Sequence, residues 1–226
     1  MSTAKTETIA EAKRYSDELR KRLPPSLEIA SISTTAKIPF KAVSWSIAVL
    51  YRASELADCA YELHNANRYV SSSIIGRALM ETAGMMYWMH RRIDNAVRTQ
   101  QLGDIDDFLM RGTLGYKEPN GFPSALSALS AVNHIDKQFK GFRGVYDILS
   151  EFTHPNWSGT LGAYSKPIKE KMRVEYGPAI RGLSWDFIPS SMCMSLMVIE
   201  TYYDKLQGLF PQFIQLCEED LKQTMT

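Results

Sequence analysis

The hydrophobic residues of this chain recur at the three- and four-residue spacing of an α-helix over most of its length. Between residues 39 and 65, one side of the predicted helix carries Val43, Ile47 and Leu50. A second long pattern runs to about residue 97, and one of the three serines 71–73 is expected to cap its first turn. The two patterns predict a pair of long helices.

Shorter helices are predicted on both sides of this pair. A highly charged stretch, residues 4–23, has apolar residues at roughly helical spacing and ends at Pro24-Pro25. Residues 26–37 are rich in Ser and Thr and are interpreted as a connector. The remaining predicted helices are residues 104–114, 124–138, 141–154, 189–206 and 211–222.

Residues 157–177 differ from the rest of the chain, because they mix Gly and Pro with alternating apolar and polar residues, as in Met172–Tyr176. This pattern favours a small β-hairpin or an irregular insertion. The predicted fold is therefore all-α, a bundle of five to seven helices with one such insertion. We expect a single domain over residues 1–226, with an N-terminal helix and connector at 1–37 and the bundle core at 38–226.

Composition narrows the class of protein. The chain has 226 residues, of which 45% are hydrophobic and 23% charged, and a net charge of +1, as in an ordinary globular domain. The three cysteines are far apart and the first 22 residues lack an apolar core, which favours a soluble, cytoplasmic protein without a membrane partner. The four histidines show no metal-ligand spacing and no phosphate-binding glycine loop is present, so neither a metal nor a cofactor is expected.

Two charged residues stand out in the second long helix. Residues 73–89 are apolar nearly all round, which is typical of a helix in the middle of a bundle. Arg77 and Glu81 nevertheless lie four residues apart on one face of it. Burying such charges is costly unless they are paired. Two interpretations stay open, a structural ion pair or a polar pocket with perturbed titratable groups.

The predicted helix that ends at Pro155 carries a second polar set. Its polar side holds Arg143, Asp147, Ser150 and His154, opposite an apolar face. This side is either a solvated surface whose histidine interacts with the helix dipole, or part of a pocket. If this helix packs on the helix of residues 73–89, we expect one cavity with two groups of residues. The catalytic candidates are Arg77, Glu81 and His154, and the ligand-binding candidates are Arg143, Tyr146, Ser150 and Asn156.

The spacing of these residues resembles a known pattern. Arg77-x-x-x-Glu81, followed by Tyr146-x-x-x-Ser150-x-x-x-His154-Pro, is similar to the motif of a bacterial family of uncharacterised all-helical proteins. Members of that family are distantly similar to HEPN domains, which are helical bundles of toxins and antiphage systems, several of which cleave RNA. The resemblance covers roughly residues 40–160. It implies a helical effector with RNA or a protein as partner, and such modules often form symmetric homodimers.

The chain departs from the HEPN pattern in one respect. HEPN ribonucleases carry an arginine and a histidine four to six residues apart, and none of the four histidines here has an arginine at that spacing. The sequence therefore leaves open whether the protein is an enzyme. One hypothesis is a metal-independent ribonuclease with His154 as acid and base, Arg77 or Arg143 binding phosphate, and Glu81 orienting. The alternative is a non-catalytic module that binds a protein partner or a small ligand through the same pocket.

Overall fold

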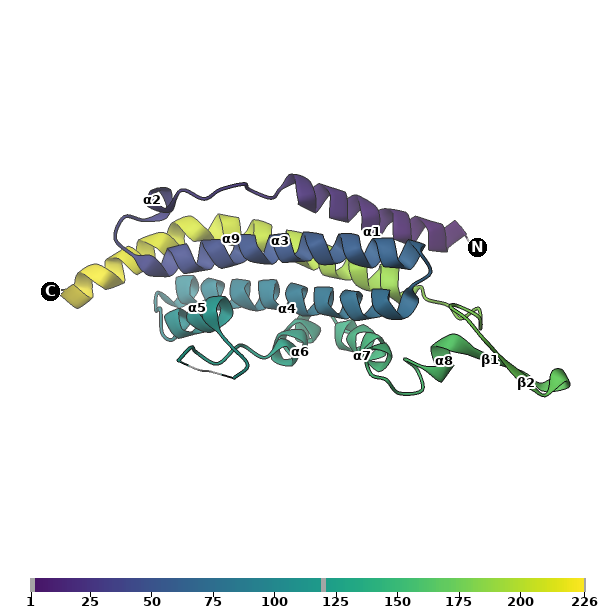
Figure 1. Cartoon of the computed structure of the whole chain (residues 1–226). Coiled ribbons are helices and arrows are strands. Elements are labelled where there is room, and N and C mark those ends of the chain that lie inside the picture. The colour runs from purple at the N-terminus through teal and green to yellow at the C-terminus, as the bar shows by residue number, and fades with distance from the viewer. Residues whose placement is uncertain (1–2, 119–120, 226) are drawn as a thin grey trace.

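Two long antiparallel helices, α3 (Lys37–Asn65) and α4 (Tyr69–Thr99), lie at the centre of the protein (Figure 1). The computed structural model describes residues 3–118 and 121–225. Fully buried alanines of α3, among them Ala53 and Ala57, let the two helices approach closely. α4 buries apolar side chains over several turns, including Leu79 and Met86, which confirms that it is an interior helix.

The N-terminal boundary of α4 differs from the prediction. The helix begins at Tyr69 with Arg68 as its N-cap residue, so none of the three serines caps it. Instead, the hydroxyl of Ser72 donates a hydrogen bond to the carbonyl of Ala60 on α3, at 2.7 Å. The hydroxyl of Ser73 donates to the carbonyl of Tyr69 one turn earlier, at 2.9 Å. Buried serine hydroxyls find backbone acceptors inside the bundle here, because they would otherwise be left without a partner.

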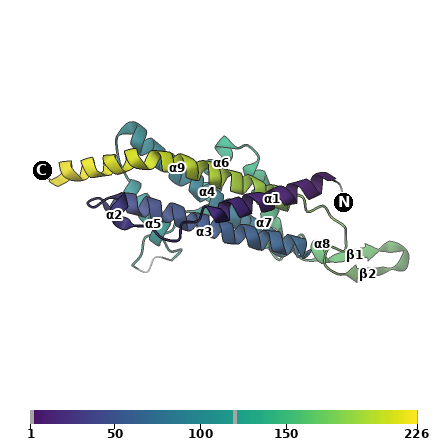
Figure 2. The same cartoon turned by 90° about the horizontal axis from the view of Figure 1, so that it is seen from above.

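One face of the central pair is covered by α1 (Thr3–Lys21) and α9 (Phe187–Met225), as the view from above also shows (Figure 2). Ala12 and Leu19 of α1 are fully buried there. α2 (Ile29–Ile32) is a single turn in the connector between α1 and α3. α1 therefore contributes to the same hydrophobic core as the helices that follow it.

The two predicted C-terminal helices are one helix. α9 runs without interruption through Gly208 and Pro211, although both residues are unfavourable inside a helix. Phe210 and Phe213, on either side of the proline, are buried in the core. Their burial holds both halves of the helix against the bundle, and so the packing outweighs the local preference for a break.

The opposite face of α4 is covered by three shorter helices, α5 (Ile105–Leu114), α6 (Ala128–Gln138) and α7 (Phe142–Thr153). Ser127 caps α6, because its side chain accepts a hydrogen bond from the backbone N–H of Ser130 at 3.2 Å. Within the described residues, seven helices have ten residues or more, which confirms the predicted helical bundle. In that part of the chain no helix is both long and apolar enough to cross a membrane.

The insertion predicted near residues 157–177 is a β-hairpin. After the single turn α8 (Leu161–Tyr164), strand β1 (Ser165–Ile168) pairs antiparallel with β2 (Arg173–Tyr176). A 3₁₀ turn, η1 (Lys169–Lys171), joins the two strands. The hairpin extends beyond the end of the bundle (Figures 1 and 2).

Candidate functional site

α4 and α7 are joined by a cluster of three polar side chains, Arg77, Glu81 and Tyr146. The Arg77 guanidinium donates from Nη2 to the hydroxyl of Tyr146 at 2.8 Å. That hydroxyl in turn donates to Oε1 of Glu81 at 2.9 Å. Nη2 of Arg77 also lies 3.2 Å from the same carboxylate oxygen, so the two charged groups form an ion pair along α4. Tyr146 therefore links both members of the predicted pair to α7.

Local packing brings the two helices close enough for this contact. Gly76 precedes Arg77, and a Cβ atom there would lie 3.3 Å from the Ser191 hydroxyl of α9 and 3.8 Å from a methyl group of Leu149. The absence of a side chain at this position lets α7 and α9 approach α4. On the α7 side, Phe142, Tyr146 and Leu149 form the buried face.

The cluster is half-buried. Tyr146 is 4% exposed, whereas the side chains of Arg77 and Glu81 are 29% and 25% exposed. Burial raises the pKa of the Tyr146 phenol above its ordinary value. The hydrogen bond from Arg77 lowers this pKa, and the hydrogen bond to Glu81 raises it further. The phenol therefore stays protonated at neutral pH and can donate to the carboxylate. The arrangement is a hydrogen-bonded ion pair, as in the structural interpretation of Arg77 and Glu81, although the buried Nε of Arg77 has no hydrogen-bond partner among the described residues.

His154 lies outside this cluster. It is the residue after the last turn of α7, with an extended backbone (φ −87°, ψ 146°) and an exposed side chain. It follows Tyr146 by eight residues, which at the rise of an α-helix corresponds to about 12 Å along α7. Within the described part of the chain, no hydrogen bond or ion pair joins it to Arg77 or Glu81, whose polar contacts are with each other and with Tyr146. The structure thus brings together two of the three catalytic candidates.

The other predicted ligand-binding residues make local contacts. Arg143 donates to Asp147 one turn later and to the side-chain oxygen of Asn133 on α6, both at 2.7 Å. The Ser150 hydroxyl donates to the carbonyl of Tyr146. Asn156 donates to the Glu151 carboxylate at 2.9 Å and accepts from a backbone N–H in the turn that follows α7. These contacts stabilise α7 and its ends, and none of them is directed at the Arg77–Glu81 pair.

Glu81 also lines a small cavity of about 240 Å³ between α3, α4 and α5. Its two arginines are already engaged, because Arg52 donates to the hydroxyl of Thr82 and Arg111 to the carbonyl of Ser124. The rest of the lining is largely apolar, with Trp45 among its residues. This cavity therefore offers a ligand few unused polar groups.

The described residues offer no metal centre, and two of the three thiols are buried. In residues 3–118 and 121–225, no cluster of three or more His, Cys, Asp or Glu side chains could hold a metal ion. The cysteines are free. Burial raises the pKa of Cys193 to about 11 and that of Cys217 to about 12, so neither thiol ionises appreciably at neutral pH.

A larger cleft, of about 710 Å³, lies where the last turns of α4 meet the start of α5 and the end of α6. Basic side chains line it from two elements, Arg91 and Arg92 from α4 and Lys137 from α6. Arg92 pairs with Asp104, the residue before α5. Among the described residues, neither Arg91 nor Lys137 has an ion-pair partner, and both are exposed. The cleft therefore contains positive charge that no carboxylate of the described chain neutralises by direct pairing.

An aromatic wall adjoins these charges. The imidazole of His134 stacks on the indole of Trp88, with ring centroids 4.8 Å apart and an angle of 28° between the planes. Burial, and then the charges of Lys137 and Arg92, lower the pKa of His134, so its ring is held neutral. Amide side chains, including Asn95 and Gln138, complete the polar part of the lining. Flat aromatic surface, amides and unpaired cations suit a small ligand with a ring and a negative charge.

Sequence reasoning missed this cleft. Arg91 and Arg92 are adjacent in the sequence, but nothing in the sequence relates them to Lys137, 46 positions after Arg91. The cleft exists because α6 packs across the C-terminal half of α4, with Gly84 in close contact with the backbone at Ala131. The only usable signal was the position of basic residues near the C-terminal ends of two predicted helices.

Comparisons with known proteins add no family to this description. No protein-family model, curated protein or solved structure matches the chain.

Proposed function

We propose that this protein is a helical binding module whose cleft between α4 and α6 takes a small anionic ligand with a flat ring. The observation that carries the proposal is the presence of Arg91 and Lys137, both without an ion-pair partner among the described residues, on the walls of one cleft. A carboxylate or phosphate placed between them gains charge-assisted hydrogen bonds from both sides. The Trp88–His134 stack offers apolar surface for the ring.

The sequence analysis gave a non-catalytic binding module as an alternative to a ribonuclease. The proposed binding site is the cleft between α4 and α6, and not the pocket predicted around Arg77, Glu81 and His154. The ribonuclease hypothesis requires His154 to act together with Arg77 and Glu81. Those two residues form hydrogen bonds with Tyr146 instead. The ribonuclease activity, the RNA partner and the homodimer therefore stay predictions.

The test measures binding of simple probes to the whole chain by calorimetry and by NMR. Benzoate supplies both ring and charge, inorganic phosphate supplies charge alone, and benzylammonium is the matched cation. We expect benzoate to bind more tightly than phosphate, and benzylammonium not to bind. A bound anion should also raise the pKa of His134, because an opposite charge favours the protonated imidazole.

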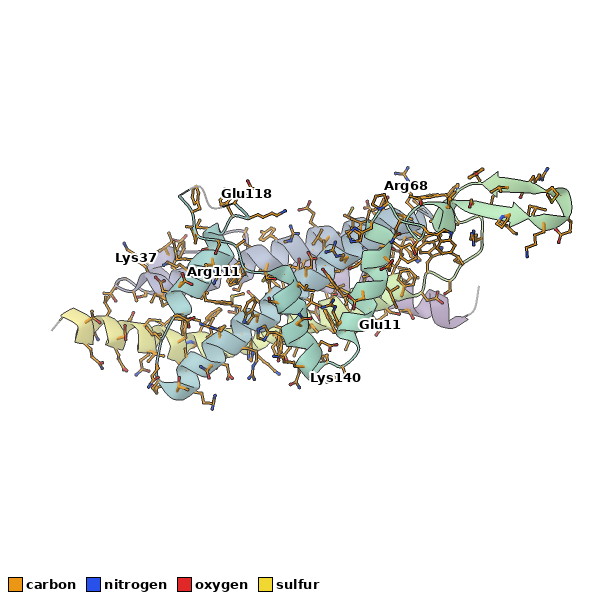
Figure 3. All side chains as sticks on the ribbon, turned by 90° about the horizontal axis from the view of Figure 1, so that it is seen from below. Glu11, Lys37, Arg68, Arg111, Glu118 and Lys140 are labelled. Carbon is orange, nitrogen blue, oxygen red and sulfur yellow. The ribbon has the colours of Figure 1, made fainter. Side chains whose placement is uncertain are left out.

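Two variants locate the binding site. Arg91→Gln and Lys137→Gln should each weaken benzoate binding about tenfold, the loss expected for one charge-assisted hydrogen bond. Lys140→Gln is the matched control, because Lys140 is exposed in the turn between α6 and α7 and does not line the cleft (Figure 3). Equal binding of benzoate and benzylammonium, or equal losses in all three variants, would contradict the proposal.

A further inference from the structure

The β-hairpin projects away from the bundle as an arm. It leaves the end of the bundle at which Arg68 lies, and the views from above and from below both show it extending past the helices (Figures 2 and 3). Its strands pair with each other over four residues each, and in the described chain no third strand joins them. An isolated two-stranded hairpin is marginally stable in water, so a surface that covers this one would stabilise it.

The hairpin is amphipathic. Residues that lie directly opposite each other in an antiparallel pair point to the same face. The register Pro167↔Val174 and Ser165↔Tyr176 therefore places an apolar set of Pro167, Val174 and Tyr176 on one face, together with the buried Ser165. In this set Val174 is 47% and Tyr176 69% exposed. At the tip, Met172 is 94% exposed, in a left-handed conformation with φ of 47°. Large apolar side chains are thus directed into solvent along the arm and at its end.

The apolar set is surrounded by basic residues. Lys169 and Lys171 lie in the 3₁₀ turn beside Met172, and both are exposed. Lys166 and Arg173 lie on the other face of the strands, where Arg173 pairs with Glu175. The hairpin holds four basic and two acidic residues, a net charge of +2, whereas the whole chain carries +1. Positive charge is therefore concentrated on the arm.

We propose that this hairpin docks on an anionic lipid bilayer, with Met172 and the apolar face at the level of the acyl chains and Lys169 and Lys171 at the headgroups. A bilayer surface offers both chemistries at once, apolar depth and negative charge. A nucleic acid would use the lysines but would leave an aliphatic tip such as Met172 without a partner. The proposal concerns contact with one leaflet, and it departs from the sequence-based expectation of no membrane partner.

The experiment is flotation of the full chain with vesicles. Vesicles of phosphatidylcholine mixed with phosphatidylserine should carry the protein, and vesicles of phosphatidylcholine alone should carry much less. Each basic residue near an anionic surface contributes about fivefold to binding, so Lys169→Gln with Lys171→Gln should weaken it about thirtyfold. Met172→Ser should weaken it about tenfold by removing the buried apolar group. Lys21→Gln with Lys37→Gln is the matched control, because both lysines are exposed and lie outside the arm.

Each outcome decides the proposal. Selective loss of flotation in the hairpin variants, with unchanged far-ultraviolet circular dichroism, supports it. It is overturned if the protein does not float with the anionic vesicles, or if the control variant loses as much binding as the hairpin variants. It is also overturned if the hairpin variants lose affinity for a single-stranded RNA oligonucleotide while vesicles bind no protein, because the arm would then be a nucleic-acid surface. None of these results depends on a ligand in the cleft between α4 and α6.

Discussion

The hydroxyl of Tyr146 donates to Glu81 at 2.9 Å across the contact between α7 and α4. The same hydroxyl accepts from Arg77, so one phenol joins both members of an ion pair that belongs to the other helix. The guanidinium carbon of Arg77 also lies 5.1 Å from the centre of the Tyr146 ring. Because Tyr146 is buried and the charges are half-buried, the cluster closes the edge of the core where α7 is held against α4.

Tyr146→Phe tests the importance of this phenol for stability. The substitution keeps the ring and its packing, and removes one donor and one acceptor while Arg77 and Glu81 stay paired. We expect the free energy of unfolding to fall by about 1–2 kcal/mol, measured in urea by circular dichroism. Tyr176→Phe, on the 69% exposed tyrosine of the hairpin, is the control and should have no effect. Equal stability of the two variants would show that the hydroxyl contributes nothing to the contact between the helices.

Glu81→Ala tests how far the ion pair is desolvated. Removing one partner from a fully buried pair typically costs about 3–5 kcal/mol. Both side chains retain about a quarter of their exposure, and the Tyr146 hydroxyl would still bind Arg77. We therefore expect a smaller loss, about 1–3 kcal/mol, in the same urea experiment.

The exposed Glu55 of α3 provides the comparison for Glu81. Glu55→Ala should change the free energy of unfolding by less than about 0.5 kcal/mol. If both substitutions lower the free energy of unfolding by a similar amount, the contribution of Glu81 to stability comes from its charge and not from its pairing with Arg77.

His154→Ala separates the ribonuclease hypothesis from the binding module. With His154 exposed and apart from Arg77 and Glu81, we expect wild type and variant to leave a labelled RNA equally intact in the purified state. The stability of the variant should equal that of the wild type, since the side chain is exposed. RNA cleavage by the wild type that disappears in His154→Ala, with the fold retained, would restore the catalytic hypothesis.

The long helices could be predicted from the sequence because their hydrophobic period is sustained over many turns. The interior position of α4 was evident from its lack of a polar side, and the hairpin from the change to alternating residues near Val174. α9 could not be predicted as one helix. Gly208 and Pro211 are local signals for a break, and only the burial of Phe210 and Phe213 against other helices explains why the helix continues.

The candidate sites were predictable only in part, for a related reason. Arg77 and Glu81 lie four residues apart in one helix, so their contact follows from helix geometry. The choice of Tyr146 as their partner, and not His154, depends on which turn of α7 faces α4. The turn of α7 that faces α4 is determined by the close packing of Leu149 against Gly76. The cleft that holds Arg91 and Lys137 depends in the same way on the packing of α6, which has no signature in the local sequence.

Three histidines that are buried or half-buried predict how stability depends on pH. Burial lowers the pKa of His64, His90 and His134 in the folded protein, whereas the pKa of a histidine in an unfolded chain is about 6.5. Protons therefore bind the unfolded chain more readily. The stability that these groups contribute is fully present above about pH 6.5 and is lost as the pH falls through the lowered native values.

Urea unfolding at a series of pH values from about 7.5 to about 5.5 measures this effect. His90→Gln should reduce the slope of the free energy of unfolding against pH, because His90 is 8% exposed and packs against the ring of Tyr202. Gln207→Asn, at an exposed position of α9, is the control and should keep the wild-type slope. A free energy of unfolding that does not change over this range in the wild type would contradict the prediction.

Gly208 and Gly112 offer opposite tests of the helical packing. Gly208 lies inside α9, and a Cβ atom there would meet no other atom within 4 Å. Because glycine is less favourable than alanine inside a helix, Gly208→Ala should raise the free energy of unfolding by about 0.5–1 kcal/mol. At Gly112 of α5, the Trp45 ring occupies the place of a Cβ atom, so Gly112→Ala should destabilise the protein by about 1–3 kcal/mol. Urea midpoints that move in the same direction would mean that α9 is not continuous at Gly208, or that α5 does not pack on Trp45 as described.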